Sequence, residues 1–342
     1  MQLLNTLYVT TPESYVHLDN ETVRVEVEHE TRLRVPLHHL GSVVCFGHVQ
    51  LSLPLMHKLA DNGIALVLLD ANGRFKARLE GAVGGNVLLR QAQYRAAQDS
   101  SLARSVARNC IAGKIKNARQ VILRGARESK STEDAATLSR VGDDLAASLR
   151  ALPGAVDLDT LRGLEGEAAR QYFTGLNRLL KPSARNEFSM DGRSRRPPRD
   201  RLNALLSFIY ALLMNDCRSA LETVGLDPQI GFLHAVRPGR AALALDLMEE
   251  FRALADRLAL ALVNRGQLAG RDFVEREGGA VLLAPDARKT VLVAYQERKQ
   301  ETLSHPLLAE PVPLGLVPYV QARLLARTLR GDTPDYLPFT VR

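Results

Sequence analysis

Residues 22–35 read TVRVEVEHETRLRV, and this stretch shows what kind of structure the first part of the chain forms. Val23, Val25 and Val27 alternate with charged residues, so an extended strand would place the valines on one face and the charges on the other. Similar apolar runs, separated by turn residues, continue to about residue 80. The pattern predicts a compact all-β domain, which we place at residues 1–85.

The pattern changes after about residue 88, where long helical stretches begin with LLRQAQYRAAQ and SLARSVARNCIAGKIKNARQVILRGAR. Residues 86–342 are therefore predicted to form a mainly α-helical domain, which makes the fold class α+β. Two stretches interrupt the helices. Residues 181–201 are irregular and very basic, and residues 280–295 are predicted to form a small hairpin.

Composition limits the class of protein. The chain has 342 residues, 46% of them hydrophobic and 24% charged, which is enough for two domains with cores of their own. There is no apolar run of membrane-spanning length and no signal-peptide pattern, so we expect a cytoplasmic protein with no membrane partner. Cys45, Cys110 and Cys217 form no CxxC pair, which argues against a disulfide framework or a structural zinc site.

Positive charge is concentrated in one segment. Residues 90–127 contain nine Lys and Arg against the single acid Asp99, whereas the whole chain carries a net charge of +7. This asymmetry favours an anionic partner such as DNA. The candidate phosphate-binding residues are Arg90, Lys114, Lys116, Arg119, Arg195, Arg196, Arg237 and Arg240. A solvated surface position is the alternative for each of them, and helix capping or a salt bridge to Glu250 is a further alternative for the last two.

Residues 231–252, GFLHAVRPGRAALALDLMEEFR, place a histidine immediately before a helix. The Val-Arg-Pro-Gly turn prevents a helix from crossing His234, so the helix is predicted to begin near Arg240. Asp246, Glu249 and Glu250 are spaced at i, i+3 and i+4 and would project from one patch of it. A solvated acidic face that favours the helix dipole is the simpler interpretation of this spacing.

A second segment, DLDTLRGLEGEAARQYF at residues 157–173, strengthens the functional interpretation. Glu165 lies on the apolar stripe of this predicted helix, and a carboxylate on a packing face must be paired, hydrogen-bonded or bound to a metal. Together, Glu165, His234 and Glu249 would form a mixed oxygen and nitrogen site, with Asp246 as a possible fourth ligand. Such a donor set suits Mg²⁺ or Mn²⁺ and the cleavage or transfer of phosphodiesters.

The segments LRGLEGEAARQYF, RRPPRDRLNALLSFIYALL and GFLHAVRPGRAALALDLMEEFR, in this order and spacing, resemble the CRISPR-associated adaptation endonucleases, which integrate spacers. The tail LLARTLRGDTPDYLPF resembles their type I-C branch. The resemblance implies Glu165, His234 and Glu249 as catalytic metal ligands. It also implies attack of a spacer 3′-hydroxyl on a phosphodiester at the boundary of a double-stranded DNA repeat.

The same resemblance implies an architecture and an assembly. An N-terminal β-sandwich-like domain would form a homodimer and precede a helical catalytic domain. A small second CRISPR adaptation protein would join two such dimers in a larger complex. From the residues alone, two other functions stay open: a junction-resolving or repair nuclease that cuts branched DNA, and a non-catalytic architectural DNA-binding protein.

Overall fold

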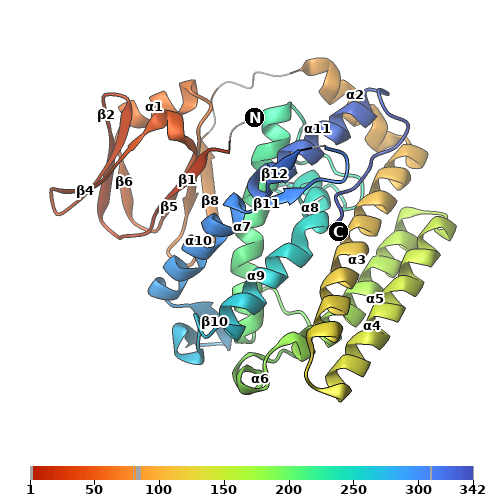
Figure 1. The fold of residues 1–342 in the computed structure, drawn as a ribbon. Helices are drawn as coiled ribbons and strands as arrows, with labels where there is room; N and C mark the ends of the chain where they lie inside the picture. Colours follow the sequence, from red (N-terminus) through yellow and green to blue (C-terminus); the bar gives the residue numbers. More distant parts are fainter. Residues whose placement is uncertain (1–2, 80, 82–85, 309, 342) are drawn as a thin grey trace. The chain divides into compact units, whose positions relative to one another are not determined.

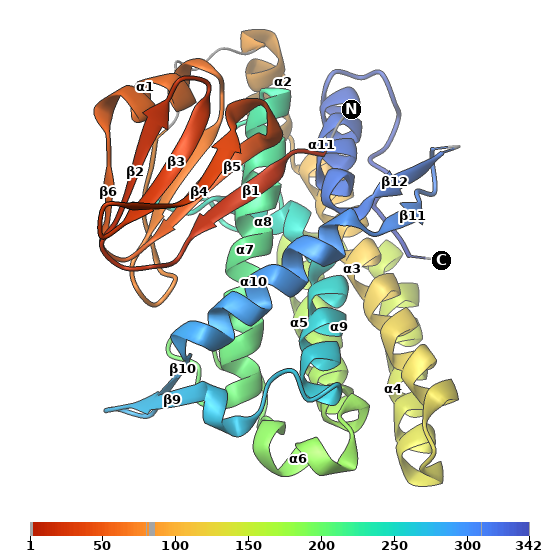
Figure 2. The same cartoon turned by 60° about the vertical axis from the view of Figure 1, so that its left-hand side comes forward.

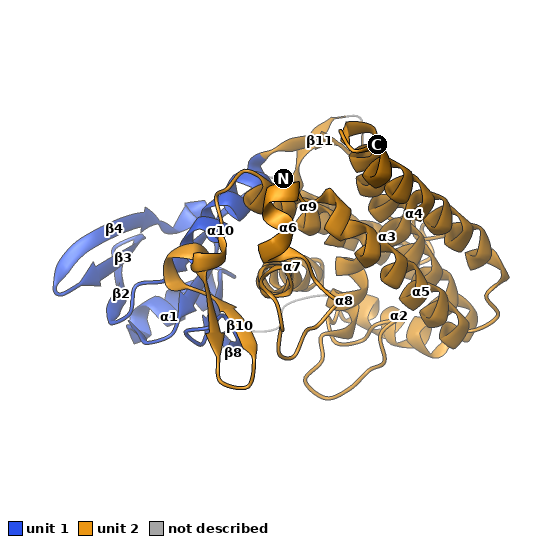
Figure 3. Cartoon of the chain, turned by 90° about the horizontal axis from the view of Figure 1, so that it is seen from below, with its two compact units in different colours: residues 1–84, 288–300 blue, residues 85–287, 301–342 orange. Residues whose placement is uncertain are grey.

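The computed structural model describes residues 3–79, 81, 86–308 and 310–341 (Figure 1). The chain divides into two compact units, coloured separately in Figure 3. Unit 1 consists of residues 1–84 and 288–300, and unit 2 consists of residues 85–287 and 301–342. The predicted domains 1–85 and 86–342 stay a prediction, which does not include the late segment 288–300 in the N-terminal unit.

Unit 1 is built from two four-stranded sheets (Figure 2). One sheet has the strand order β1 (Asn5–Val9), β5 (Leu40–Phe46), β7 (Ala65–Leu69) and β8 (Phe75–Leu79). In this sheet β1, β5 and β7 are parallel, and β8 is antiparallel to β7. The other sheet has the strand order β4 (Glu30–Pro36), β3 (Thr22–Val27), β2 (Ser14–Asp19) and β6 (Val49–Leu51). The helix α1, Leu53–Asp61, follows β6.

Both sheets contribute to one hydrophobic core. Val23 and Val25 of β3 are buried as their alternation predicts, and they belong to the same cluster as Val43 of β5 and Leu66 of β7. Leu59 of α1 completes this cluster. An α+β fold with a sandwich-like β unit is therefore confirmed, and the period-two pattern of the sequence is its physical cause.

The predicted hairpin at residues 280–295 is wrong. Only β10, Ala280–Leu283, is a strand there, and it pairs with β9, Phe273–Arg276. The helix α10, Pro285–Gln300, follows it directly. Pro285 stands at the start of this helix and Asp286 lies in the first turn, and both are favourable helix-start residues. The later part of α10 belongs to unit 1, where the Gln296 side chain donates to the Thr6 carbonyl at 2.8 Å.

Unit 2 is mainly helical. Its helices are α2 (Val87–Gln98), α3 (Ser100–Glu128), α4 (Thr132–Ala151), α5 (Leu158–Leu176), α6 (Pro182–Phe188), α7 (Arg201–Val224), α8 (Ala242–Met248), α9 (Arg252–Asn264) and α11 (Val317–Leu329). A single 3₁₀ turn, η4 (Glu249–Phe251), joins α8 to α9. A short pair of strands, β11 and β12, covers Thr302–Ser304 and Pro311–Pro313.

Side-chain caps and buried apolar faces fix these helices. Asp99, Asp157 and Asp200 accept backbone N–H bonds at the starts of α3, α5 and α7. The long helix α3 packs against α4, α5 and α9 (Figure 1). By length and composition Arg201–Val224 could cross a bilayer, but 61% of its most apolar window is buried inside the structure, as in a core helix.

Candidate functional site

Three segments of unit 2 bring together the acids and the histidine predicted from sequence. The helix α5 carries Glu165, the loop before α8 carries His234, and the α8–η4 segment carries Asp246 and Glu249. Gly231 allows this loop to lie against α8, because a Cβ atom there would stand 2.7 Å from an oxygen of Asp246. The loop that carries His234 thus lies against the helix that carries Asp246, and the role of these residues stays a prediction.

Asp246 orients His234. One carboxylate oxygen of Asp246 lies 2.7 Å from His234 Nδ1, and the two oxygens also accept the backbone N–H groups of Phe232, Leu233 and His234 at 2.6, 3.0 and 2.9 Å. An Nδ1–H directed at this carboxylate leaves the Nε2 lone pair free on the opposite side of the ring. Asp246 is 1% exposed and both of its oxygens are occupied by these contacts, so in this structure it positions His234, and its role as a possible fourth ligand stays a prediction.

Glu249 lies in the direction of that free nitrogen. One of its oxygens, Oε1, is 3.9 Å from His234 Nε2, and the other, Oε2, is bound by Lys114 Nζ at 2.7 Å and Arg252 Nε at 2.8 Å. Glu249 is only 3% exposed. Burial alone would raise the pKa of its carboxyl, but Arg252, Lys114 and His234 outweigh burial and lower the pKa below its ordinary value. Glu249 is therefore a carboxylate at neutral pH.

Lys114 connects Glu249 to Glu165. Its ammonium nitrogen forms an ion pair with Oε1 of Glu165 as well as with Oε2 of Glu249. Lys114 comes from α3, and its side chain is 14% exposed, whereas that of Glu165 is 25% exposed. Two carboxylates from different helices therefore share one cation, with the imidazole of His234 beside the inner carboxylate.

The donor set fits a hard divalent ion. Two carboxylates and a neutral imidazole are ligands that Mg²⁺ and Mn²⁺ accept, and both carboxylates already face one cationic group. Within the described ranges, however, no group of three or more His, Cys, Asp and Glu side chains is arranged to hold a metal as it stands. The ammonium of Lys114 is the cation that Glu165 and Glu249 share in this structure.

Glu250 does not share the patch of Asp246 and Glu249, contrary to the prediction from helical spacing. The 3₁₀ turn directs it into the core, where it accepts bonds from Tyr336 Oη at 2.5 Å, the Phe339 N–H at 2.6 Å and Gln321 Nε2 at 2.9 Å. Burial raises the pKa of Glu250 to about 7. A salt bridge from Arg237 or Arg240 to Glu250 is therefore not formed.

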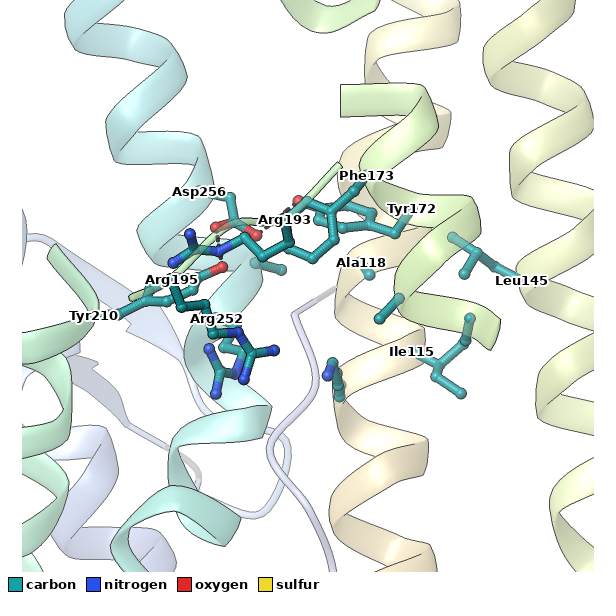
Figure 4. A pocket seen from close by; sticks show the side chains of 14 residues that line it. Ile115, Ala118, Leu145, Tyr172, Phe173, Arg193, Arg195, Tyr210, Arg252 and Asp256 are labelled. Carbon is teal, nitrogen blue, oxygen red and sulfur yellow. Dashed lines mark hydrogen bonds between the residues drawn. The ribbon is translucent and has the colours of Figure 1, made fainter. Parts of the chain in front are cut away.

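A pocket, shown in Figure 4, shares with the site Lys114 and Arg252, the two cations that contact Glu249. Lys114, Arg193, Arg195 and Arg252 line it together with aromatic residues of α5 and α7. The guanidinium groups of Arg193 and Arg252 lie 5.3 and 4.7 Å from the ring centroid of Tyr210. The pocket therefore places cationic side chains immediately beside Glu249.

One buried acid also lines this pocket. Asp256 accepts the hydroxyl groups of Tyr172 at 2.9 Å and Tyr210 at 2.6 Å. Burial raises the pKa of Asp256 to about 6, although both hydroxyl groups act in the opposite direction. Its hydrogen-bond partners are thus tyrosines of α5 and α7, and Arg252 and Arg193 of the same pocket also lower its pKa.

The predicted DNA-binding residues have different surroundings. Lys114 belongs to the carboxylate cluster, Arg195 is exposed at the pocket, and Arg119 donates to the Gly142 carbonyl at 2.9 Å. Arg90 donates weakly to the Gly225 carbonyl at 3.4 Å. The exposed candidates are Lys116, Arg196 and Arg237, and Arg240 is half-buried. The structure thus brings two of the eight to the site and leaves their roles as predictions.

Sequence reasoning missed three residues of the site and the adjoining pocket. It assigned no role to Arg252, although its spacing of three residues from Glu249 on a helical segment is a signal for such an ion pair. It also overlooked Asp256, a carboxylate within the apolar stretch of α9, and Tyr210 on the facing helix. For Asp256, the available signal is a charged residue within an apolar helix. No local signal identifies Tyr210.

The fold and site define a class: an α+β protein whose helical unit carries a carboxylate–imidazole centre surrounded by cationic side chains. The family model for CRISPR associated protein Cas1 matches residues 7–297. A CRISPR-associated endonuclease Cas1 of Moorella thermoacetica is 59% identical over 341 residues, covering 99% of each chain. The chain belongs to the Cas1 family, which confirms the predicted family and the prediction that it is an endonuclease. The type I-C assignment stays a prediction.

Two solved structures share the fold. A casposase bound to integration product aligns with a TM-score of 0.84 at 20% identity, covering 98% of this chain and 93% of that chain. A chain from a Cas6-RT-Cas1–Cas2 complex aligns with a TM-score of 0.81 at 25% identity, covering 98% of this chain and 36% of that chain. Both alignments extend over nearly the whole of the described architecture.

Proposed function

We propose that this chain is a metal-dependent DNA endonuclease and strand transferase of CRISPR adaptation, which inserts spacer DNA by attack of a 3′-hydroxyl on a phosphodiester. One observation carries the proposal. Glu165 and Glu249, from helices far apart in the sequence, converge on one cationic group beside the free nitrogen of His234. Two carboxylates that converge on one position are the oxygen ligands that a hard divalent ion takes.

In this proposal, some residues bind a cation and others orient the residues that bind it. Glu165, His234 Nε2 and Glu249 would hold Mg²⁺ or Mn²⁺, and Asp246 fixes the ring of His234. When bound, such an ion polarises a phosphoryl oxygen and stabilises the charge that develops on the attacking and leaving oxygens. Arg252 keeps Glu249 ionised and in place through its bond of 2.8 Å.

The substrate and the assembly follow from charge and from the relatives. Double-stranded DNA suits the basic side chains of residues 90–127 and of the pocket. A small second adaptation protein as partner is supported by the Cas1–Cas2 complex that shares the fold. The homodimer formed through unit 1 and the cytoplasmic location are parts of the same proposal, and the mass of the purified protein by light scattering tests the first.

Strand transfer tests the proposal directly. A labelled duplex with free 3′-hydroxyls is incubated with a plasmid carrying a cognate repeat, the small partner protein and Mn²⁺ or Mg²⁺. We expect insertion at the repeat boundary, lost on chelation and reduced at least a hundredfold by His234→Ala and by Glu165→Gln. Glu167→Gln is the matched control, because Glu167 is on the same helix and pairs with the exposed Arg170.

Other results would replace the proposal. Tight DNA binding by the wild type with no cleavage, unchanged by either substitution, would favour an architectural DNA-binding protein. Efficient cutting of branched DNA, with no preference for the repeat, would favour a junction or repair nuclease. A loss of activity in Glu167→Gln equal to that in Glu165→Gln would remove the argument for the site.

A further inference from the structure

The ammonium of Lys114 stands between the two carboxylates that the proposed function assigns to the metal. It contacts Oε1 of Glu165 and Oε2 of Glu249 simultaneously. Arg252 binds the same Oε2 of Glu249 from another side, so two side-chain cations balance two carboxylates. The charge of this centre is therefore already neutralised by the protein itself.

We propose that Lys114 is a displaceable internal cation: it holds Glu165 and Glu249 together when no metal is bound and competes with the metal for the space between them. The inference rests on the proposed function and adds a control on metal affinity to it. A divalent ion placed between the same oxygens would repel an ammonium strongly at such short range, so Lys114 must move when the ion enters.

The surroundings of Lys114 give it a place to move to. It also lines the pocket with Arg193 and Arg195, and its flexible four-carbon stem allows the ammonium to rotate while the backbone of α3 stays fixed. Arg195 is exposed there and has no ion-pair partner among the residues the structure describes. Once displaced, Lys114 would add its charge to this basic pocket, where a DNA phosphate is a suitable partner.

The backbone of α3 is closely packed at this turn, so displacement would involve the Lys114 side chain rather than the helix. A Cβ atom on Gly113 would stand 2.8 Å from Pro338 and 3.3 Å from Glu250, so α3 is packed closely against the C-terminal segment and η4 at this turn. Asn117, one turn further along, donates to the carbonyl groups of Glu250 and Phe339 at 2.7 and 3.0 Å.

The test is Mn²⁺ affinity, measured by calorimetry and by electron paramagnetic resonance in the absence of DNA. Lys114→Met removes the competing charge and keeps an unbranched stem. We expect it to bind Mn²⁺ about tenfold more tightly or better, because two carboxylates then face the ion without an ammonium between them. Lys114→Arg keeps the charge and should not bind the ion more tightly than the wild type does.

Lys130→Met is the matched control for net charge, because Lys130 lies just after α3, is exposed to solvent and is not among the candidate phosphate-binding residues. We expect its Mn²⁺ affinity to equal that of the wild type. Binding of a short duplex in saturating Mn²⁺ gives the second measurement: Lys114→Met should bind DNA more weakly although it binds metal more tightly. A higher Mn²⁺ affinity together with a lower DNA affinity distinguishes displacement of Lys114 from a purely structural contact.

The outcomes separate this inference from the function on which it rests. If the wild type binds Mn²⁺ and Lys114→Met binds it equally or more weakly, Lys114 is not a competitor, while the metal site stands. If only Lys114→Met binds the ion, competition is supported in its strongest form. If neither binds Mn²⁺, both the metal-dependent function and this inference are overturned. Near-ultraviolet circular dichroism of each variant verifies that it is folded.

Discussion

At the scale of single residues, the placement of Asp246 decides what His234 can do. Because Asp246 is held by three backbone N–H groups, its carboxylate provides a rigid acceptor for Nδ1 of the ring. The ring nitrogen that faces Glu249 is then the one with the lone pair. This indirect role could not be distinguished from direct metal binding in the sequence, where Asp246 and Glu249 are equally plausible neighbours of His234.

Asp246→Asn should therefore weaken metal binding without removing a ligand. An amide at this position can present its NH₂ group to Nδ1 and favour the wrong tautomer, and the loss of such a partner typically costs 10–100-fold in metal affinity. Calorimetric titration with Mn²⁺ measures the change. Because a buried acceptor of backbone bonds is altered, thermal unfolding is measured in parallel. Unchanged affinity in a folded variant would contradict the positioning role.

The burial of Glu250 leads to a prediction about how the free energy of unfolding depends on pH. Its pKa is raised from 4.5 to about 7 in the folded protein by burial, so between these values the folded state binds more protons than the unfolded state. The free energy of unfolding should consequently fall as pH rises through this window, by a few kcal/mol at most, since each pKa unit corresponds to about 1.4 kcal/mol. Glu250→Gln should lack this contribution to the slope.

Urea unfolding of the wild type and of Glu250→Gln at several pH values from 4.5 to 8 provides the measurement. The variant also loses one hydrogen-bond acceptor for Tyr336 or Phe339, which lowers its stability at every pH and leaves the slope comparison intact. Equal slopes in the two proteins would show that Glu250 does not hold its proton in the folded state.

At the scale of elements, the C-terminal segment stabilises the turn that carries Glu249. Phe339 is 1% exposed and stacks on Phe251 of η4 with ring centroids 5.5 Å apart. Phe339→Ala should lower the free energy of unfolding by about 3–5 kcal/mol, the usual range for a buried phenylalanine. It should also weaken Mn²⁺ binding, because η4 then loses its support. Urea unfolding and calorimetry measure the two effects.

Leu337→Ala is the control for that substitution. Leu337 lies two residues away and is 52% exposed, so its side chain contributes little packing, and we expect a change within about 0.5 kcal/mol. If both substitutions destabilise the protein to the same extent, the segment acts through general packing rather than through the contact with Phe251.

The elements also show what the sequence could and could not specify. Period-two alternation identified the β unit, and helical spacing placed Glu165 on a face that meets other residues. Spacing along one helix does not show which helix lies opposite, so the ion pairs of Lys114 on α3 with Glu165 and Glu249 were not predicted. The 3₁₀ turn at η4 rotates Glu250 away from Glu249, a change that an α-helical pattern does not contain.

At the scale of the whole molecule, positive charge predicts how DNA binding depends on salt. If the basic side chains contact phosphates, the logarithm of the DNA affinity should fall with the logarithm of salt concentration by about 0.9 for each phosphate contacted. Arg195→Ala should reduce this slope by roughly one and weaken binding to different sequences equally. Arg195 is a suitable choice because it is exposed beside the pocket and its loss leaves no buried partner.

Fluorescence anisotropy with a short labelled duplex, at 50 to 300 mM salt and with Mn²⁺ held constant, measures the slopes. Arg119→Ala is the useful comparison, because the Arg119 guanidinium donates to the Gly142 carbonyl of α4 and is therefore held in a structural contact. We expect it to lower stability and to change the slope less than Arg195→Ala does. A slope near zero for the wild type would exclude phosphate contacts as the source of affinity, and the concentration of basic residues at 90–127 would then need another partner.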